Sequence, residues 1–368
     1  MKVILLPGSD EKPWDGVDVY AYELGRRLAR MGHEVLGIKA GEENHVSRVE
    51  GNYVLKFIKT PSLRGGMGHH LRFQLAVFRG LKDLLEADLV HAIGGFYASV
   101  EAIPLKRKVV TIIGASTLRK DSGRLVRAIY GNLIYRFASA YIVPNPIIQR
   151  EVERVYRIKG AHVIPIGVDL DSLKVRKSKA ELRSAHQLDE DDLVVLYVGQ
   201  LVRGKRLPEL IRAFNLVKGR KPKAKLVLTA WGYLERECRE LVKELKLSDS
   251  VIFIKPVPYH RRWEIYGMAD VFAMIGDSFG DGGVSSALLD AMGAGLPAVV
   301  ARGTANCLVV KDGYNGYSVD PTEVDEVAEA ILRCLEESEG MGRNSKEVAK
   351  GMDWNSVASR ISSLYEGL

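Results

Sequence analysis

Short, unbroken apolar runs alternate with amphipathic helical stretches along almost the whole chain, and this alternation limits the possible folds more than any other feature. The runs of the first half are Val3–Leu6, Val35–Ile38, Leu89–Ile93, Val109–Ile113, Tyr141–Val143 and Val163–Ile166. Strands covered by helices on both faces have this continuous apolar character. Helical periodicity lies between the runs, at about 17–31, 70–86, 122–138 and 146–156. The order predicts an α/β fold with a doubly wound parallel sheet.

The alternation restarts after the charged stretch 174–192, which we interpret as the link between two domains. The later runs are Val194–Val198, Leu226–Thr229, Val251–Ile254, Val271–Ile275 and Ala298–Val300, with helical patterns near 205–218, 234–246, 284–294 and 323–338. We therefore predict Rossmann-like domains at 1–171 and 172–352, a size that suits a chain of 368 residues. The amphipathic segment 353–368 is predicted to be a helix that packs back on the first domain. Because ligands of open α/β sheets bind beyond the carboxyl ends of the strands, we expect a site in the cleft between the domains.

Composition narrows the possible partners. The net charge of +7 and the pI near 9.1 favour an anionic partner: a phosphate compound, an anionic bilayer or nucleic acid. No aromatic-basic motif supports nucleic acid, so no nucleic-acid partner is expected. The three cysteines show no metal-ligand spacing, which argues against a zinc site or a disulfide framework. With an N-terminal apolar run too short for a signal peptide, the chain is predicted to be cytoplasmic.

The most informative stretch is 276–300, where an apolar run is followed by a loop of Gly, Asp and Ser residues and then by a helix. A helix start offers free N–H groups and a positive dipole end, both of which favour phosphate. Gly282 and Gly283 would let the backbone approach a diphosphate closely. Asp290, inside the helix, is placed to accept hydrogen bonds from a ribose diol. The alternative is that Ser285 is an ordinary N-cap and Asp290 a solvated helix residue.

A second stretch, 198–214, also passes from an apolar run through a glycine turn into a helix. Arg203, Lys205 and Arg206 lie in the turn or in the first helical turn, where cations oppose the helix dipole. This arrangement indicates an anion that offsets them, and a solvated basic turn is the alternative. Two such sites in one domain would hold a diphosphate from two sides.

Other motifs are absent or ambiguous. The loop 8–16 is not GxGxxG, and the chain contains no P-loop, HExxH or GxSxG motif. The helical segments 70–85 and 124–136 combine apolar and basic residues. They are consistent either with core packing or with peripheral contact with the inner face of an anionic membrane.

The order of motifs resembles the family 4 glycosyltransferases, which are retaining enzymes with the GT-B fold. The resemblance covers the chain almost end to end, and its matching segments are Asp15-Gly16, Tyr22-Glu23-Leu24, Met31-Gly32-His33-Glu34-Val35, Ile164-Pro165-Ile166-Gly167-Val168-Asp169, Val198-Gly199-Gln200-Leu201 through Lys205, Leu289-Asp290-Ala291-Met292-Gly293-Ala294-Gly295-Leu296-Pro297, Lys311-Asp312-Gly313-Tyr314-Asn315-Gly316 and the closing helix from Trp354 to Leu368. It implies a nucleotide diphosphate sugar as donor, transfer with retention, and no metal requirement. We expect the N-terminal domain to bind the acceptor, which the sequence leaves open among a sugar, a lipid-linked sugar, a polysaccharide and a small metabolite.

The resemblance also implies roles for individual residues. Lys205 stands where the family has the lysine that binds the donor diphosphate, and Arg203 is expected to assist it. Asp290 replaces the family's ribose-binding glutamate and is one methylene shorter. The remaining donor-binding residues implied are Gly16, Gly199, Gln200, Gly283, Ser285 and Ser286.

Three positions depart from the family pattern. Gln200 replaces the usual arginine, Gly282 the usual sugar-binding glutamate, and Ile113 the usual histidine near the reacting carbon. We expect Asp281, or otherwise Asp277, to bind the donor sugar in place of that glutamate. The departures keep one alternative open: a degenerate, non-catalytic paralogue that serves as a nucleotide-binding or partner subunit. A nucleotide-sugar epimerase, which can share this two-domain fold, is a second alternative.

Overall fold

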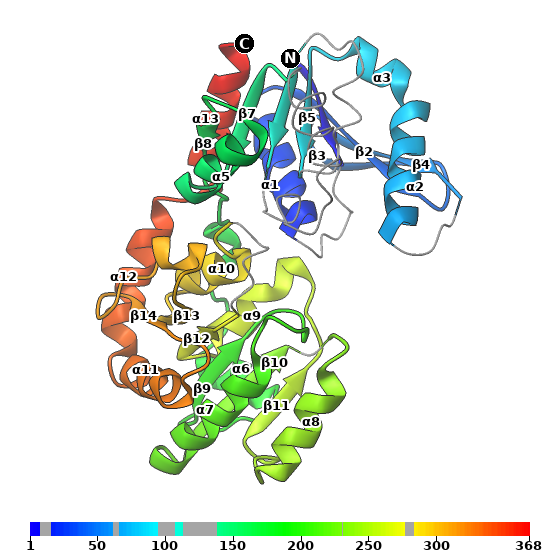
Figure 1. Cartoon of the computed structure of the whole chain (residues 1–368). Helices are drawn as coiled ribbons and strands as arrows, with labels where there is room; N and C mark the ends of the chain where they lie inside the picture. The colour runs from blue at the N-terminus through cyan, green and yellow to red at the C-terminus, as the bar shows by residue number, and fades with distance from the viewer. Residues whose placement is uncertain (8–15, 62–65, 95–106, 113–137, 230, 277–282) are drawn as a thin grey trace. The chain divides into compact units, whose positions relative to one another are not determined.

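The chain folds into two compact units, each built on its own sheet (Figure 1). The computed structural model describes residues 1–368 apart from 8–15, 62–65, 95–106, 113–137, 230 and 277–282. The first unit comprises Met1–Gly167, Gly280–Gly283 and Trp354–Leu368, and the second comprises Val168–Phe279 and Val284–Asp353. Among the described helices, none combines the length and the apolar character needed to cross a bilayer.

The first unit contains an eight-stranded sheet in the order β3-β4-β2-β1-β5-β6-β7-β8. Its strands are β1 (Lys2–Leu6), β2 (Glu34–Gly41), β3 (His45–Glu50), β4 (Tyr53–Lys59), β5 (Leu89–Ile93), β6 (Lys108–Thr111), β7 (Ala140–Val143) and β8 (His162–Val163). Every pairing is parallel except that of β3 with β4. The antiparallel pair was not predicted, because β3 is mostly exposed and lacks the apolar run that marks the other strands.

The described helices of the first unit are α1 (Gly16–Arg30), α2 (Gly66–Arg79), α3 (Leu81–Glu86), α5 (Pro146–Tyr156) and α13 (Trp354–Glu366). A single helix was predicted over 70–86, but the structure breaks it at Gly80. A side chain there would begin 3.2 Å from Ile38 Cδ1 and 3.3 Å from Ile58 Cδ1, so the glycine lets the helix pair approach the sheet. The predicted helix over 122–138 lies outside the described residues.

The C-terminal helix α13 packs on the first unit, as the sequence predicted. Trp354, Val357, Ile361 and Tyr365 join the same buried cluster as Val3 and Leu5 of β1, although they come from the other end of the chain (Figure 1). Trp354 lies edge-on to Tyr20 of α1, with ring centroids 5.1 Å apart. The indole also contacts Gly167, where a Cβ atom would lie 2.5 Å from Trp354 Cδ2.

The second unit contains a six-stranded parallel sheet in the order β11-β10-β9-β12-β13-β14. Its strands are β9 (Leu193–Tyr197), β10 (Ala224–Thr229), β11 (Val251–Ile254), β12 (Val271–Met274), β13 (Ala298–Ala301) and β14 (Gly316–Val319). Its described helices are η4 (Asp171–Leu173), α6 (Lys179–Ser184), α7 (Leu207–Arg220), α8 (Glu235–Glu244), η5 (Tyr259–Arg261), α9 (Arg262–Gly267), α10 (Ser286–Ala294), η6 (Ala305–Leu308), α11 (Val324–Glu336) and α12 (Ser338–Lys350). Two Rossmann-like α/β sheets are thus present, and the predicted fold class is confirmed.

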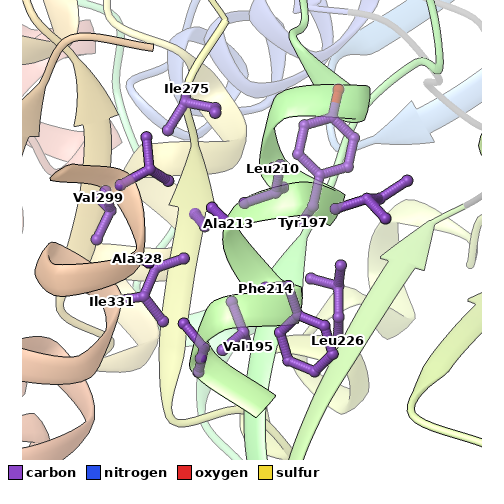
Figure 2. Close-up of a cluster of buried hydrophobic side chains, with 14 of the residues drawn as sticks. Val195, Tyr197, Leu210, Ala213, Phe214, Leu226, Ile275, Val299, Ala328 and Ile331 are labelled. Atoms are coloured by element: carbon purple, nitrogen blue, oxygen red, sulfur yellow. The ribbon is translucent and has the colours of Figure 1, made fainter. Parts of the chain in front are cut away.

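The core of the second unit is apolar on the face that α7 and α11 cover (Figure 2). Phe214 of α7 and Ile331 of α11 are fully buried in one cluster with residues of β9, β10, β12 and β13. Figure 2 shows these side chains meeting Val195 and Leu226 of the sheet. This packing buries Val195 and Tyr197 of the run Val194–Val198, and Val194 and Leu196, which point to the other face of the strand, are fully buried as well.

The charged stretch 174–192, interpreted from sequence as a link between domains, lies within the second unit. Ser178 and Glu181 form a capping box at the start of α6. Arg183 then donates from Nη2 to Asp270 Oδ2 at 2.7 Å, and both side chains are largely buried. The charges of this stretch therefore belong partly to a packed structure. The chain passes between the two units at Gly167–Val168 and again at Asp353–Trp354.

Candidate functional site

The two stretches singled out from sequence begin at neighbouring strands of the second sheet. β9 and β12 pair side by side, while β10 lies on the other side of β9 and β13 on the other side of β12. The strand order therefore reverses between β9 and β12. In open α/β sheets, loops diverge at such a reversal and leave a crevice beyond the carboxyl ends, where ligands bind. The turn 199–206 follows β9, and the segment leading to α10 follows β12.

The turn after β9 is held in one conformation by its neighbours. Tyr197, fully buried, donates from its hydroxyl to the carbonyl of Gln200 at 2.9 Å, and the Gly199 N–H donates to Thr229 Oγ1 at 3.0 Å. A side chain at position 199 would begin 2.8 Å from the Tyr197 hydroxyl, so this position requires glycine. The Arg203 N–H donates to the Tyr233 hydroxyl at 2.9 Å. These bonds fix the backbone that carries the predicted anion-binding residues.

Lys205 lies against the chain that leaves β12. A Cβ atom at Gly276 would lie 2.9 Å from the Gly204 carbonyl oxygen and 3.1 Å from the Lys205 Cα atom. Glycine at 276 therefore permits a close approach that any other residue would prevent. The structure thus brings the basic turn close to Gly276, where the chain leaves β12. Within the turn, Lys205 is partly buried, while Gln200 and Arg203 are exposed.

The start of α10 differs in one respect from the prediction. Ser285 is its N-cap but makes no side-chain capping bond, and its own N–H donates to Asn306 Oδ1 at 3.0 Å. The first N–H bonded within the helix is that of Leu289, which donates to the Ser285 carbonyl at 3.0 Å. An anion at this terminus would therefore meet the N–H groups of residues 286–288. Asn306, buried in η6, carried no sequence signal for this role.

Asp290 of α10 is largely buried and paired, so its interpretation as an ordinary solvated helix residue is wrong. Its Oδ2 atom accepts from Arg262 Nε at 2.9 Å, and the two side chains are 13% and 7% exposed. Burial raises the pKa of Asp290, and the nearby Asp169 carboxylate raises it further, while the Arg262 guanidinium opposes that rise. Arg262 in turn lies flat on Tyr259, with Cζ 3.7 Å from the ring centroid.

The Asp-Gly-x-Asn-Gly segment has a structural role. Asn315, fully buried, accepts from the Lys311 N–H at 2.7 Å and donates to the Val309 carbonyl at 2.9 Å. Asp312 accepts from the Ser318 N–H at 2.6 Å. Gly316 lies so close to the Ala298 carbonyl of β13 that no side chain fits. This turn therefore shapes the entry to β14.

The remaining predicted site residues fall into three groups. Asp277, Asp281 and Gly282, with Ile113, lie outside the described residues, so their predicted roles stay predictions. Gly283 and Ser286, both partly buried, flank the start of α10. Gly16 is the exposed first residue of α1 in the first unit.

Family models match both halves of the chain. The model described as "Glycosyltransferase Family 4" matches residues 14–172, and the model described as "Glycosyl transferases group 1" matches residues 178–350. The two matches together leave out only the ends and a short segment between them.

Curated relatives and solved structures show the same pattern. The chain is 27% identical to a GDP-mannose-dependent alpha-(1-6)-phosphatidylinositol monomannoside mannosyltransferase of Mycobacterium tuberculosis, over 72% of this chain and 66% of that protein. It is 25% identical to D-inositol 3-phosphate glycosyltransferase 2 of Catenulispora acidiphila, over 95% of this chain and 89% of that protein.

Among solved structures, sucrose-phosphate synthase from Thermosynechococcus elongatus superposes with a TM-score of 0.81 at 20% identity, covering 100% of this chain and 99% of that one. Anabaena HepE in complex with UDP superposes with a TM-score of 0.78 at 18% identity, covering 100% of both chains. At these identities the structural likeness establishes the fold, and the motif order and the two family models supply the rest. The chain is a divergent member of the family 4 glycosyltransferases, with the two Rossmann-like domains of the GT-B fold.

Proposed function

We propose that this glycosyltransferase takes its sugar from a nucleotide diphosphate sugar whose diphosphate lies between the turn after β9 and the first turn of α10. The observation that carries the proposal is the close approach of Gly276 to Gly204 and Lys205, at the point where the strand order of the second sheet reverses. A lysine, an arginine and the N–H groups of the first turn of α10 supply there the positive potential that a diphosphate requires.

The proposed chemistry places most of the catalytic work on the leaving group. In transfer with retention, the bond from the anomeric carbon to the diphosphate breaks on the same face on which the acceptor hydroxyl attacks, and the leaving phosphate takes the acceptor proton. Lys205, Arg203 and the N–H groups of α10 would stabilise the charge that develops on the diphosphate, the largest electrostatic task in such a step. No metal ion is needed if these groups neutralise it, and Asp281 remains the proposed ligand of the donor sugar.

Lys205 provides the direct test. We expect UDP, GDP or ADP, or the donors UDP-glucose and GDP-mannose, to raise the melting temperature, because a ligand at about 100 times its Kd adds about 2.7 kcal/mol to folding stability. Lys205→Ala should raise the Kd of the nucleotide that stabilises the wild type about tenfold or more. The matched control is Lys243→Ala on the exposed surface of α8, which should leave binding unchanged. Binding that is indifferent to Lys205 would exclude this site.

The same preparation separates the remaining alternatives. Incubation with the nucleotide-sugar that binds, with phosphatidylinositol mannosides, inositol phosphate or simple sugars as acceptors, should yield a glycoside with the donor's anomeric configuration, also in the presence of EDTA. Nucleotide binding without transfer to any acceptor would favour a non-catalytic paralogue. Conversion of the donor alone, followed by NMR, would reveal an epimerase.

We also propose that the first unit binds the acceptor and makes peripheral contact with an anionic membrane through α2 and α3. Leu75, Phe78 and Leu85 are exposed there, Phe78 by 74%. Lys82 and Arg79 are exposed beside them. Apolar and basic side chains on one surface bind anionic bilayers. Co-sedimentation with phosphatidylglycerol vesicles should fall in Phe78→Ser, and equal sedimentation of the variant would refute this contact. The second predicted membrane segment, 124–136, lies outside the described residues.

A further inference from the structure

The Arg262–Asp290 pair points to a residue that the motif comparison did not include. Asp290 stands at the position proposed to bind the ribose, but an aspartate reaches less far than a glutamate. Arg262, at the start of α9, binds one of its two oxygens at 2.9 Å. The other oxygen, Oδ1, has no hydrogen bond to any described residue, and it is not among the buried polar atoms that lack a partner. It therefore retains contact with solvent.

Arg262 is itself fixed from three sides. Its Nε binds Asp290, its Nη1 donates to the Tyr259 carbonyl at 2.9 Å, and its guanidinium stacks on the Tyr259 ring. An arginine held in this way allows the carboxylate a single orientation. Three other groups act on this carboxylate or pack near it: Asp169, the buried hydroxyl of Tyr266 and the backbone of α10.

We propose that Arg262 is a positioning residue for ribose recognition: it holds Asp290 through Oδ2 so that Oδ1 accepts a hydrogen bond from one ribose hydroxyl. This inference rests on the proposed function, because it assumes a nucleotide in the crevice of the second unit. Without Arg262 the buried carboxylate would lose the cation that offsets its burial, and it would rotate or take up a proton. Arg262 thus makes up for the shorter reach of Asp290, and ribose recognition uses a single oxygen where a glutamate would offer two.

The test compares nucleotides with and without the relevant hydroxyls. The probe is whichever of UDP, GDP and ADP binds wild type, measured by calorimetry beside its 2′-deoxy and 3′-deoxy counterparts. We expect wild type to prefer the ribonucleotide over one counterpart by about tenfold or more, as hydrogen bonds to a charged acceptor do. Asp290→Ala should abolish the preference, and Arg262→Met should abolish it although Asp290 is still present. The double variant should match Asp290→Ala.

The chain offers a closely matched control. Arg183–Asp270 is a second pair in the same unit, with side chains 5% and 13% exposed and an Nη2–Oδ2 distance of 2.7 Å. Arg183→Met should lower the melting temperature as Arg262→Met does, yet leave the preference for the ribonucleotide intact. If Arg262→Met fails to fold, Arg262→Lys is the second variant. It keeps the positive charge but not the planar guanidinium, so it should lower the preference for the ribonucleotide in part.

Two results would overturn the proposal. One is an unchanged preference in Arg262→Met, which would reduce the pair to a structural contact. The other is a wild type that binds ribonucleotide and deoxynucleotides equally. A wild type that binds no nucleotide would instead refute the proposed function, so the two failures are distinguishable.

Discussion

Helices cover the two sheets in different ways. In the second unit α7 and α11 lie on the sheet through apolar side chains such as Phe214 and Ile331. In the first unit α13 also contributes apolar residues, but buried hydrogen bonds join it to the unit as well. His91 of β5 binds the Tyr365 hydroxyl through Nδ1 at 2.5 Å and Thr111 Oγ1 through Nε2 at 2.6 Å. His33 binds Ser362 at 2.8 Å.

The difference follows from where the helices come from. α7 is joined directly to the strands that it covers, so local connection and apolar burial suffice to place it. α13 returns to its sheet from 274 residues away, measured between His91 and Tyr365. Directional hydrogen bonds in a low dielectric allow one register where apolar contact alone would allow several. Burial keeps this network uncharged: it lowers the pKa of His91 to about 3 and raises that of Tyr20 to about 12.

The largest expected effect tests the apolar contact between α7 and the second sheet. Phe214→Ala removes a fully buried ring between α7 and the sheet and should destabilise the second unit by about 3–5 kcal/mol. Hydrogen exchange measured by mass spectrometry should speed up in peptides of β9, β10 and α7, while β1 and β5 keep their protection. Equal loss of protection in both sheets would show that the two units unfold together, and the comparison would then not hold.

Lowering the pH tests the hydrogen bonds that hold α13 on the first sheet. Neutral His91 takes up a proton in the folded state only near pH 3, whereas the unfolded chain takes one up below about pH 6.5. The unfolded state therefore binds more protons between these values, and stability falls as pH is lowered through this window. We expect about 3 kcal/mol to be lost between pH 6.5 and pH 4 from this group, measured by urea unfolding. His91→Gln, which cannot titrate, should show a correspondingly flatter profile, and identical profiles would contradict the assignment.

The smallest expected effect concerns a single hydrogen bond, the one between His91 and Tyr365. Tyr365→Phe keeps the ring but leaves His91 Nδ1 without this partner, which should cost about 1–2 kcal/mol in urea unfolding. Tyr314→Phe, on an exposed ring of the second unit, is the control and should change stability by less than about 0.5 kcal/mol. A Tyr365→Phe variant as stable as this control would mean that the hydroxyl contributes nothing to docking.

The sequence predicted the elements that carry an apolar run and failed where the signal was weak. Strands such as Leu89–Ile93 and Val251–Ile254 were predicted with their observed bounds. The hairpin β3–β4 was not, because an exposed edge strand has no continuous apolar run. Predicted helix ends differ from those observed by a residue or two at most positions, since caps are decided by local bonds such as the one between Ser178 and Glu181.

For the candidate site, local pattern located the segments but not their partners. The glycine turn near Lys205 and the helix start near Ser285 were recognised because their residues are adjacent in sequence. Asn306 and Arg262 were missed because they reach Ser285 and Asp290 from 21 and 28 residues away. Nothing in their own surroundings marks them, since a buried arginine on a short helix resembles any surface arginine in a linear pattern.

Apart from Gly280–Gly283, which are grouped with the first unit, the second unit is an insertion in the first that begins at Val168 and ends at Asp353. Its two ends are adjacent, since the Val168 N–H donates to the Met352 carbonyl at 2.8 Å. On the other side of the junction, Gly167 touches the Trp354 ring. We therefore expect that removing segment 168–353 and joining residue 167 to residue 354 through a short linker would keep the first unit with its own last helix. A plain truncation before residue 354 would instead leave that unit with an uncovered apolar face.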